Sequence, residues 1–240
     1  MQRIARTLLL ITFVTLVAGL SADAATSSTW RAYAHRNGVF APVADRFGDF
    51  PIARTFHLDA CPLGDLPPAW HVRAALYTDL TRDGEPECAL LVWRPWQDWP
   101  IMRWSDTPSP IAANRDARGD SAHIILLQRV AGRRLQSTDD PSQPPTNPRR
   151  LGYRELWAGS ALALPITQIA AGDVDGDGWN ELAALEGDYT AGRYGPARHV
   201  AVWRWNGFGF TLQWRSPPDR FFALALADFE GDGMVEVLVR

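Results

Sequence analysis

Four carboxylates within one short segment could together hold a hard metal ion. Residues 173–181 read D-V-D-G-D-G-W-N-E, and the acids are Asp173, Asp175, Asp177 and Glu181. Alternate side chains of a tight loop can converge on one point, and Gly178 permits the sharp reversal that precedes the last acid. Carboxylates this close repel each other unless a cation neutralises them. The segment therefore predicts a Ca²⁺ site completed by the backbone carbonyl of Trp179, the alternative being an acidic turn without metal.

Two further segments share this spacing with fewer or altered ligands. Residues 79–87 read D-L-T-R-D-G-E-P-E, and residues 228–236 read D-F-E-G-D-G-M-V-E. Their candidate ligands are Asp79, Thr81, Asp83, Glu87, Asp228, Glu230, Asp232 and Glu236. Thr81 lacks a carboxylate and Glu230 is one methylene longer than aspartate, so weaker Ca²⁺ binding is expected in both segments. We call the three segments, in chain order, the first, second and third loop.

The sequence around the loops indicates that each one joins two β-strands. Small and apolar residues precede each loop, at 74–76, 169–171 and 223–226, and a second apolar run follows it, at 88–92, 182–185 and 237–239. These runs have the length of strands rather than helices. The small residues before each loop are typical of an inner strand in a crowded environment.

A hairpin signal recurs at both ends of the chain. Asn206-Gly207 and Asn37-Gly38 each lie between apolar runs, and both residues of such a pair can adopt positive φ in a tight turn. No hairpin follows the third loop, whereas the hairpin near residue 37 has no loop before it. We therefore expect residues 29–46 and 223–239 to form one sheet from both ends of the chain, which would hide exposed edges. In the alternative, the first hairpin packs elsewhere.

The loop and its strands resemble FG-GAP and VCBS repeats of integrin-α-like β-propellers. The resemblance covers most of residues 70–240 and is most specific at 173–181, although Glu181 stands where the family often has aspartate. It implies an all-β, propeller-like repeat of four-stranded antiparallel blades in which Asp173, Asp175, Asp177 and Glu181 bind Ca²⁺. The first two loops are farther apart than the last two, which leaves three or four blades as alternatives.

The beginning of the chain predicts export. Residues 1–25 combine two arginines, an apolar run and an Ala-Asp-Ala cleavage motif, as in a secretory signal peptide. We expect residues 26–240 to form a single propeller-like domain with an insertion around 94–150, secreted or periplasmic and not membrane-spanning. In such a compartment Cys61 and Cys88 are expected to form a disulfide, the alternative being two unrelated cysteines.

The remaining residues favour binding over catalysis. The formal net charge is −3 and the chain contains no lysine, which argues against a nucleic-acid partner and against lysine chemistry. The five histidines are scattered outside any catalytic motif. A non-enzymatic module that binds a protein or glycan is therefore expected, with a hydrolase on a propeller scaffold as an alternative.

Tryptophan is abundant and clusters at Trp93, Trp96, Trp99 and Trp104. An exposed cluster would be a partner-contact surface, and Trp96 and Trp99 are the candidate contacts. It would also permit a lectin-like function. The alternative is aromatic packing between blades.

Overall fold

The computed structural model describes residues 29–47, 61, 63, 66–96, 111–130, 152–228 and 234–240. The predicted signal peptide lies outside these residues, and so do Trp99, Trp104, Glu230 and Asp232. Within them the regular structure consists of β-strands and one short 3₁₀-helix, which confirms the all-β expectation. None of the described helices is long and apolar enough to cross a membrane.

The elements are, in chain order, β1 (Thr29–Arg36), β2 (Val39–Phe47), β3 (His71–Thr78), β4 (Glu87–Pro95), β5 (Asp120–Arg129), β6 (Tyr153–Ala158), β7 (Ile166–Gly172), β8 (Glu181–Glu186), the 3₁₀-helix η5 (Tyr189–Ala191), β9 (His199–Trp205), β10 (Phe210–Arg215), β11 (Leu224–Ala227) and β12 (Glu236–Val239).

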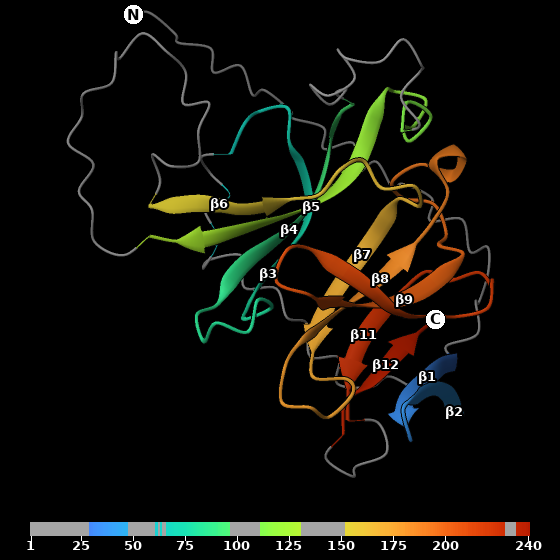
Figure 1. Cartoon of the computed structure of the whole chain (residues 1–240). Helices are drawn as coiled ribbons and strands as arrows, with labels where there is room; N and C mark the ends of the chain where they lie inside the picture. The colour runs from blue at the N-terminus through green and yellow to red at the C-terminus, as the bar shows by residue number, and fades with distance from the viewer. Residues whose placement is uncertain are drawn as a thin grey trace, which may run out of the picture.

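The strands form three four-stranded antiparallel sheets. The first blade has the order β3-β4-β5-β6, the middle blade β7-β8-β9-β10, and the composite blade β11-β12-β1-β2. Figure 1 shows the middle blade between the other two, without a closed ring in the described part of the chain. Three sheets are the smaller of the two expected blade numbers, because β5 and β6 belong to the same sheet as β3 and β4. The range predicted as an insertion, 94–150, thus contains a blade strand.

The inner strands are built from small residues, as expected. β7 packs against both β3 and β11, the corresponding strands of the neighbouring blades. Ala75, Ala170 and Ala225 are buried in these three strands. Short side chains let the inner strands approach each other closely, which brings the loops that follow them to the same end of the molecule.

The blades are joined by two apolar layers on opposite faces of β8. Every residue of β8 is buried, as expected for a strand covered on both faces. Leu182 packs with Leu91 of the first blade, whereas Leu185 packs with Val237 of the composite blade. Alternate side chains of one strand thus hold both neighbours. Burial of each such leucine contributes roughly 1.5–3 kcal/mol.

Both ends of the described chain meet in the composite blade. β1 pairs with β12 in antiparallel register, with Tyr33 opposite Val237 (Figure 1). The expectation that residues 29–46 and 223–239 share one sheet is confirmed. Asn37 and Gly38 connect β1 and β2 with φ of 53° and 82°, the two positive angles that the hairpin signal predicted.

The second Asn-Gly pair also connects two paired strands, β9 and β10, as predicted, but through a different turn. Gly207 has a φ of 92°, but Asn206 is not in the positive region. The N–H of Asn206 donates to the carbonyl of Gly209, and its side-chain oxygen accepts from the N–H groups of Phe208 and Gly209, all at 2.9 Å. An asparagine side chain that organises the turn in this way removes the need for a positive φ at its own position.

Candidate metal centre

The second loop folds around the side chain of its first residue. Asp173 Oδ1 accepts from the N–H groups of Gly176 (2.8 Å) and Asp177 (3.1 Å), and its Oδ2 accepts from the N–H of Gly178 (2.8 Å). Gly176 and Gly178 have φ of 77° and 86°, which glycine adopts without strain. The pattern D-x-x-G-x-G thus shapes a closed loop between β7 and β8.

The four acids of the second loop converge in this loop. One oxygen from each carboxylate lies within 4.8 Å of the others. The acid cluster, as we call it, comprises Asp173, Asp175, Asp177 and Glu181. Glu181 is the first residue of β8 and is only 1% exposed, and its Oε2 accepts from the N–H of Val174 at 3.3 Å. A cavity of about 170 Å³ beside Asp175 and Glu181 leaves room for access to the cluster.

Two guanidinium groups contact the acid cluster from other elements. Arg204, on β9, forms ion pairs with Asp175 and with Asp177, the latter at 2.8 Å. Arg82 reaches across from the first loop, and its Nη2 lies 3.1 Å from Glu181 Oε1 and 3.6 Å from Asp177 Oδ2. Among the described residues, two positive charges therefore face four carboxylates.

Sequence reasoning missed both arginines. Arg204 lies one residue beyond the paired Leu182 and Trp203, so it faces Glu181 across the sheet, which only the strand register reveals. Arg82 occupies the fourth position of the first loop and acts on the second. One signal was present in the sequence, because arginine replaces the glycine that stands at this position in the other two loops.

Burial makes the last acid of the cluster unusual. Loss of solvent raises the pKa of Glu181 to about 7, and the negative charge of Asp175 adds to the rise. Arg204 and the N–H of Val174 act in the opposite direction. The cluster thus retains an uncompensated negative charge that a divalent cation would neutralise.

The first loop has the same backbone hydrogen bonds. Asp79 accepts from the N–H groups of Arg82 (2.7 Å) and Gly84 (2.9 Å), and Glu87 accepts from the N–H of Leu80 (3.0 Å). Arg82 and Gly84 have φ of 67° and 88°, close to the values of Gly176 and Gly178. Arginine at a left-handed position is strained, so the rest of the loop must hold it there.

The first loop gathers fewer acids. Oxygens of Asp79, Asp83 and Glu87 lie within 4.8 Å of one another. Thr81, at the position of Asp175, donates its hydroxyl to Glu87 Oε1 at 2.7 Å. Gln128 on β5 donates to Asp83 at 3.1 Å, where the second loop has Arg204. Burial raises the pKa of Glu87 as it does that of Glu181.

Neighbouring loops are also tied to each other directly. The side-chain amide of Asn180 donates to Thr78 Oγ1 (2.8 Å) and to the carbonyl of Asp79 (3.2 Å). On the other side, the ring Nδ1 of His35 lies 3.3 Å from the carbonyl oxygen of Asp175. The second loop is therefore held from both adjacent blades.

The third loop is described only at its two ends. Asp228 follows β11, and Glu236 begins β12 with 1% of its surface exposed, as Glu181 begins β8. Glu230 and Asp232 lie outside the described residues, so these two predicted ligands stay predictions.

The predicted tryptophan surface is only partly in the described chain, and its first member, Trp93, follows the alternative of aromatic packing between blades. Trp93 is fully buried and donates its indole N–H to the carbonyl of Ile166 at 3.2 Å, because β4 is covered on both faces. Trp96 is half-buried and donates to the carbonyl of Ile111 at 3.0 Å. Trp179 of the second loop is 40% exposed, with Arg82 over its ring at 5.7 Å.

Cys61 and Cys88 are joined by a disulfide. Cys88 is the second residue of β4, and both cysteines belong to an apolar cluster on the outer face of the first blade together with Leu90 and Ile125. The bond attaches the segment before β3 to this blade.

One comparison with known proteins gave a match. The family model of the FG-GAP-like repeat matches residues 173–239, which contain the second loop, three strands of the middle blade (β8, β9 and β10), and β11 and β12 of the composite blade. The match begins at the first acid of the second loop. Neither the curated proteins nor the solved structures gave a match.

Proposed function

Because residues 173–239 form an FG-GAP-like repeat, we propose that this repeat protein is an exported, calcium-binding module that binds a protein partner through its loops. The observation that carries the proposal is the convergence of four carboxylates in the second loop. Export rests on the sequence of residues 1–25, and a glycan partner is the alternative that the tryptophan content suggests.

The donor set of the second loop fits calcium. Ca²⁺ prefers about six to eight oxygen ligands, from carboxylates, backbone carbonyls and water. The four carboxylates and the carbonyl of Trp179 would supply most of these, and the adjacent cavity gives water access. The set contains no sulfur or imidazole ligand, which disfavours softer metals.

Calcium in the second loop would compete with the two arginines. Arg204 shares the oxygens of Asp175 and Asp177 that the ion would need, and Arg82 shares those of Glu181. Calcium binding would therefore weaken these ion pairs, and one Ca²⁺ ion would take the place of two guanidinium groups beside the carboxylates. The free energy gained is smaller than for an uncompensated cluster, which predicts modest affinity for this loop.

A bound ion would stabilise the junction of the blades. The second loop contacts the first loop through Asn180 and the composite blade through His35. An ion that holds this loop in place binds the folded chain better than the unfolded one, and so raises the free energy of unfolding. The exposed side chains of Trp179 and Met234 would belong to the partner-contact surface at this end.

Terbium luminescence tests the calcium site. Tb³⁺ resembles Ca²⁺ in its ligand preference and is excited by energy transfer from a nearby tryptophan. We expect terbium emission on excitation of the purified mature protein, displaced by Ca²⁺. Trp179→Phe should remove most of the emission without changing the Ca²⁺ affinity measured by calorimetry, because only the carbonyl of residue 179 is a ligand.

Two variants serve as controls. Asp173→Asn with Asp177→Asn should abolish the emission and the tightest phase of Ca²⁺ binding in the calorimetric titration, whereas Trp70→Phe, on the outer face of the first blade, should change neither. Emission and tight calcium binding that both survive the double acid substitution would place the main site outside the second loop and overturn the proposal.

A further inference from the structure

A second candidate site lies between the first and the middle blade, away from the acid cluster. A cavity of about 380 Å³ is enclosed by strands of both blades and by the linker 159–165, which connects β6 to β7. Small-molecule sites in proteins have volumes of roughly 300–1,000 Å³ and are lined mainly by apolar side chains. The cavity is therefore large enough for a small ligand.

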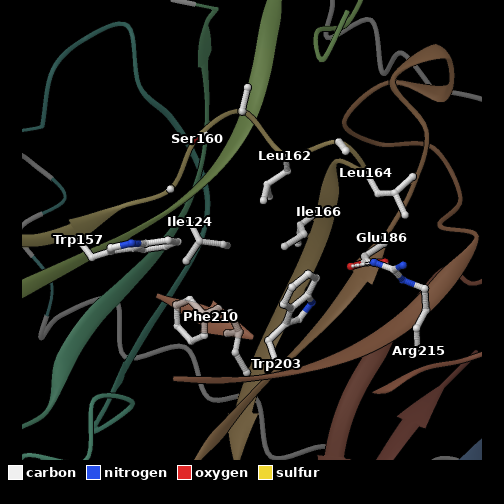
Figure 2. A pocket seen from close by; sticks show the side chains of 14 residues that line it. Ile124, Trp157, Ser160, Leu162, Leu164, Ile166, Glu186, Trp203, Phe210 and Arg215 are labelled. Carbon is white, nitrogen blue, oxygen red and sulfur yellow. Dashed lines mark hydrogen bonds and ion pairs between the residues drawn. The ribbon is translucent and has the colours of Figure 1, made fainter. Parts of the chain in front are cut away.

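The walls of the cavity are mostly apolar and aromatic. Figure 2 shows Trp157 and Phe210 at one end, Trp203 and Ile166 in the middle, and Leu162 from the linker on the opposite side. The rings of Trp157 and Phe210 meet edge to face with centroids 5.4 Å apart. Aromatic contacts of this kind fix the orientation of the rings, so the wall is formed before any ligand arrives.

One polar group in this wall has no partner. The indole Nε1 of Trp203 is buried and makes no hydrogen bond within the described structure. By contrast, Trp93 and Trp96 each donate to a backbone carbonyl. A buried donor without an acceptor costs roughly 1–3 kcal/mol. An indole N–H can only donate, so a ligand that relieves this cost must present an acceptor to Trp203.

The other end of the cavity is polar but neutral overall. Arg215 donates to both carboxylate oxygens of Glu186, from Nε at 2.6 Å and from Nη2 at 3.1 Å. In Figure 2 this ion pair lies on the side of the Trp203 ring that carries the indole nitrogen. Because the two charges compensate each other, this end favours neither a cationic nor an anionic ligand.

We infer that the cavity binds a neutral, largely apolar small molecule that carries a carbonyl or ether oxygen, which accepts a hydrogen bond from the N–H of Trp203. The aromatic and aliphatic walls hold the apolar part, and the oxygen lies between Trp203 and the Glu186–Arg215 pair. A sugar fits poorly, because most of its hydroxyl groups would be buried against apolar walls without partners.

A pair of naphthalene probes tests this inference. 2-Acetylnaphthalene has a carbonyl acceptor, and 2-ethylnaphthalene has the same shape without one. Each is titrated against the full mature protein in competition with prodan, a neutral naphthalene ketone whose emission shifts to the blue in apolar sites. We expect saturable prodan binding, and tighter competition by the acetyl compound than by the ethyl compound.

Substitutions locate the site and the hydrogen bond. Trp203→Phe keeps an aromatic wall but removes the hydrogen-bond donor. It should therefore weaken the binding of the acetyl compound by about three- to tenfold and leave the binding of the ethyl compound unchanged. Ala163→Phe, at the exposed mouth of the cavity, should weaken the binding of both compounds, whereas Trp70→Phe should change the binding of neither. Thermal melts establish that each variant is folded. Equal effects of Trp203→Phe on the two compounds, or prodan binding unaffected by Ala163→Phe, would overturn the inference.

Discussion

The first and second loops have the same backbone but different charges. In both, an aspartate at the first position accepts from the N–H groups of the fourth and sixth residues, and a buried glutamate closes the loop. The second loop has an acid where the first has Thr81, and it faces Arg204 where the first faces Gln128. The conformation of each loop thus depends on its first and last acids. The third position of the loop sets its charge, and this position differs between the loops together with the residue that faces the loop, Gln128 or Arg204.

A large expected pH effect arises outside both loops, at His123. His123 is buried on β5, and its Nδ1 lies 2.9 Å from the carbonyl of Gly159, so Nδ1 carries the proton and Nε2 accepts from the hydroxyl of Ser121. Burial lowers the pKa of His123 to about 4. The unfolded chain takes up a proton below about pH 6.5, and the folded chain does not. Stability present above pH 6.5 is therefore lost as the pH falls toward 4, by about 3 kcal/mol.

Chemical denaturation between pH 4 and 8 measures this loss. In His123→Gln the contribution of His123 to the pH dependence of the unfolding free energy should be absent. The pH dependence that remains then arises from the carboxylates. An unchanged slope in the variant would show that His123 is protonated in the folded state. The two loops are best compared at about pH 8, where His123 is neutral in both states and Glu181, with its pKa of about 7, is mostly ionised.

If the residues that face the two loops, Arg204 and Gln128, are exchanged, stability should change more through the second loop than through the first. Arg204→Gln gives the second loop the partner that the first loop has, and leaves Asp175 and Asp177 with less compensation. We expect the calcium-free protein to lose about 2 kcal/mol of unfolding free energy, less than for a fully buried pair because Arg204 is partly exposed. Calcium should restore much of this loss.

The reverse exchange is the matched control. Gln128→Arg places a cation opposite Asp83, which is exposed, but also beside Arg154, which donates to Gln128. The attraction and the repulsion oppose each other at the surface, so stability should change by no more than about 0.5 kcal/mol. Equal effects of the two substitutions in urea denaturation would contradict the difference in charge compensation between the loops.

Removal of the aspartate at the first position should lower the unfolding free energy by the same amount in the first and the second loop. Asp79→Ala and Asp173→Ala each remove the acceptor that organises the loop backbone, and each should lower the calcium-free stability by about 1.5 kcal/mol. The measurement is the same denaturation series. A loss more than twice as large in one loop would show that the shared hydrogen bonds are not equivalent in energy.

Exchange of the third position should move calcium affinity from one loop to the other. Asp175→Thr should weaken binding at the second loop by about fivefold, or about 1 kcal/mol, and Thr81→Asp should strengthen binding at the first by a similar factor. Calorimetric titration of each variant in the Asp173→Asn or Asp79→Asn background removes the contribution of the other of these two loops. A first loop that stays without affinity after Thr81→Asp would assign its weakness to another feature, such as Pro86.

The sequence allowed most of the fold to be predicted, because the governing signals were local. The runs of small and apolar residues around each loop predicted the paired strands, and the unmatched hairpin near residue 37 predicted the composite blade. The hairpin at Asn206 was predicted correctly, but a side-chain hydrogen bond, rather than a positive φ at Asn206, holds its turn. The burial of Trp93 depends on a layer formed by another blade, which no local pattern reveals.

The site was predictable to the extent that it lies within one loop. Asp173, Asp175 and Asp177 are close in sequence, so their convergence follows from the turn alone. Arg82 and Arg204 come from another blade and another strand, and their roles depend on register and on the packing of the blades. The indole of Trp203 is a similar case, since its missing partner is visible only once the cavity is formed.

The composite blade can be completed only at the end of synthesis, because its strands come from both ends of the described chain. The ribosome releases β1 and β2 early, but the strand that pairs with β1 is the last one described in the chain. Until β12 emerges, one edge of the early hairpin has no partner and is open to pairing with other chains. The contact that joins the two ends spans nearly the whole sequence, so it forms late and slowly. We expect the nascent chain to depend on chaperones that shield this edge until the final strand arrives.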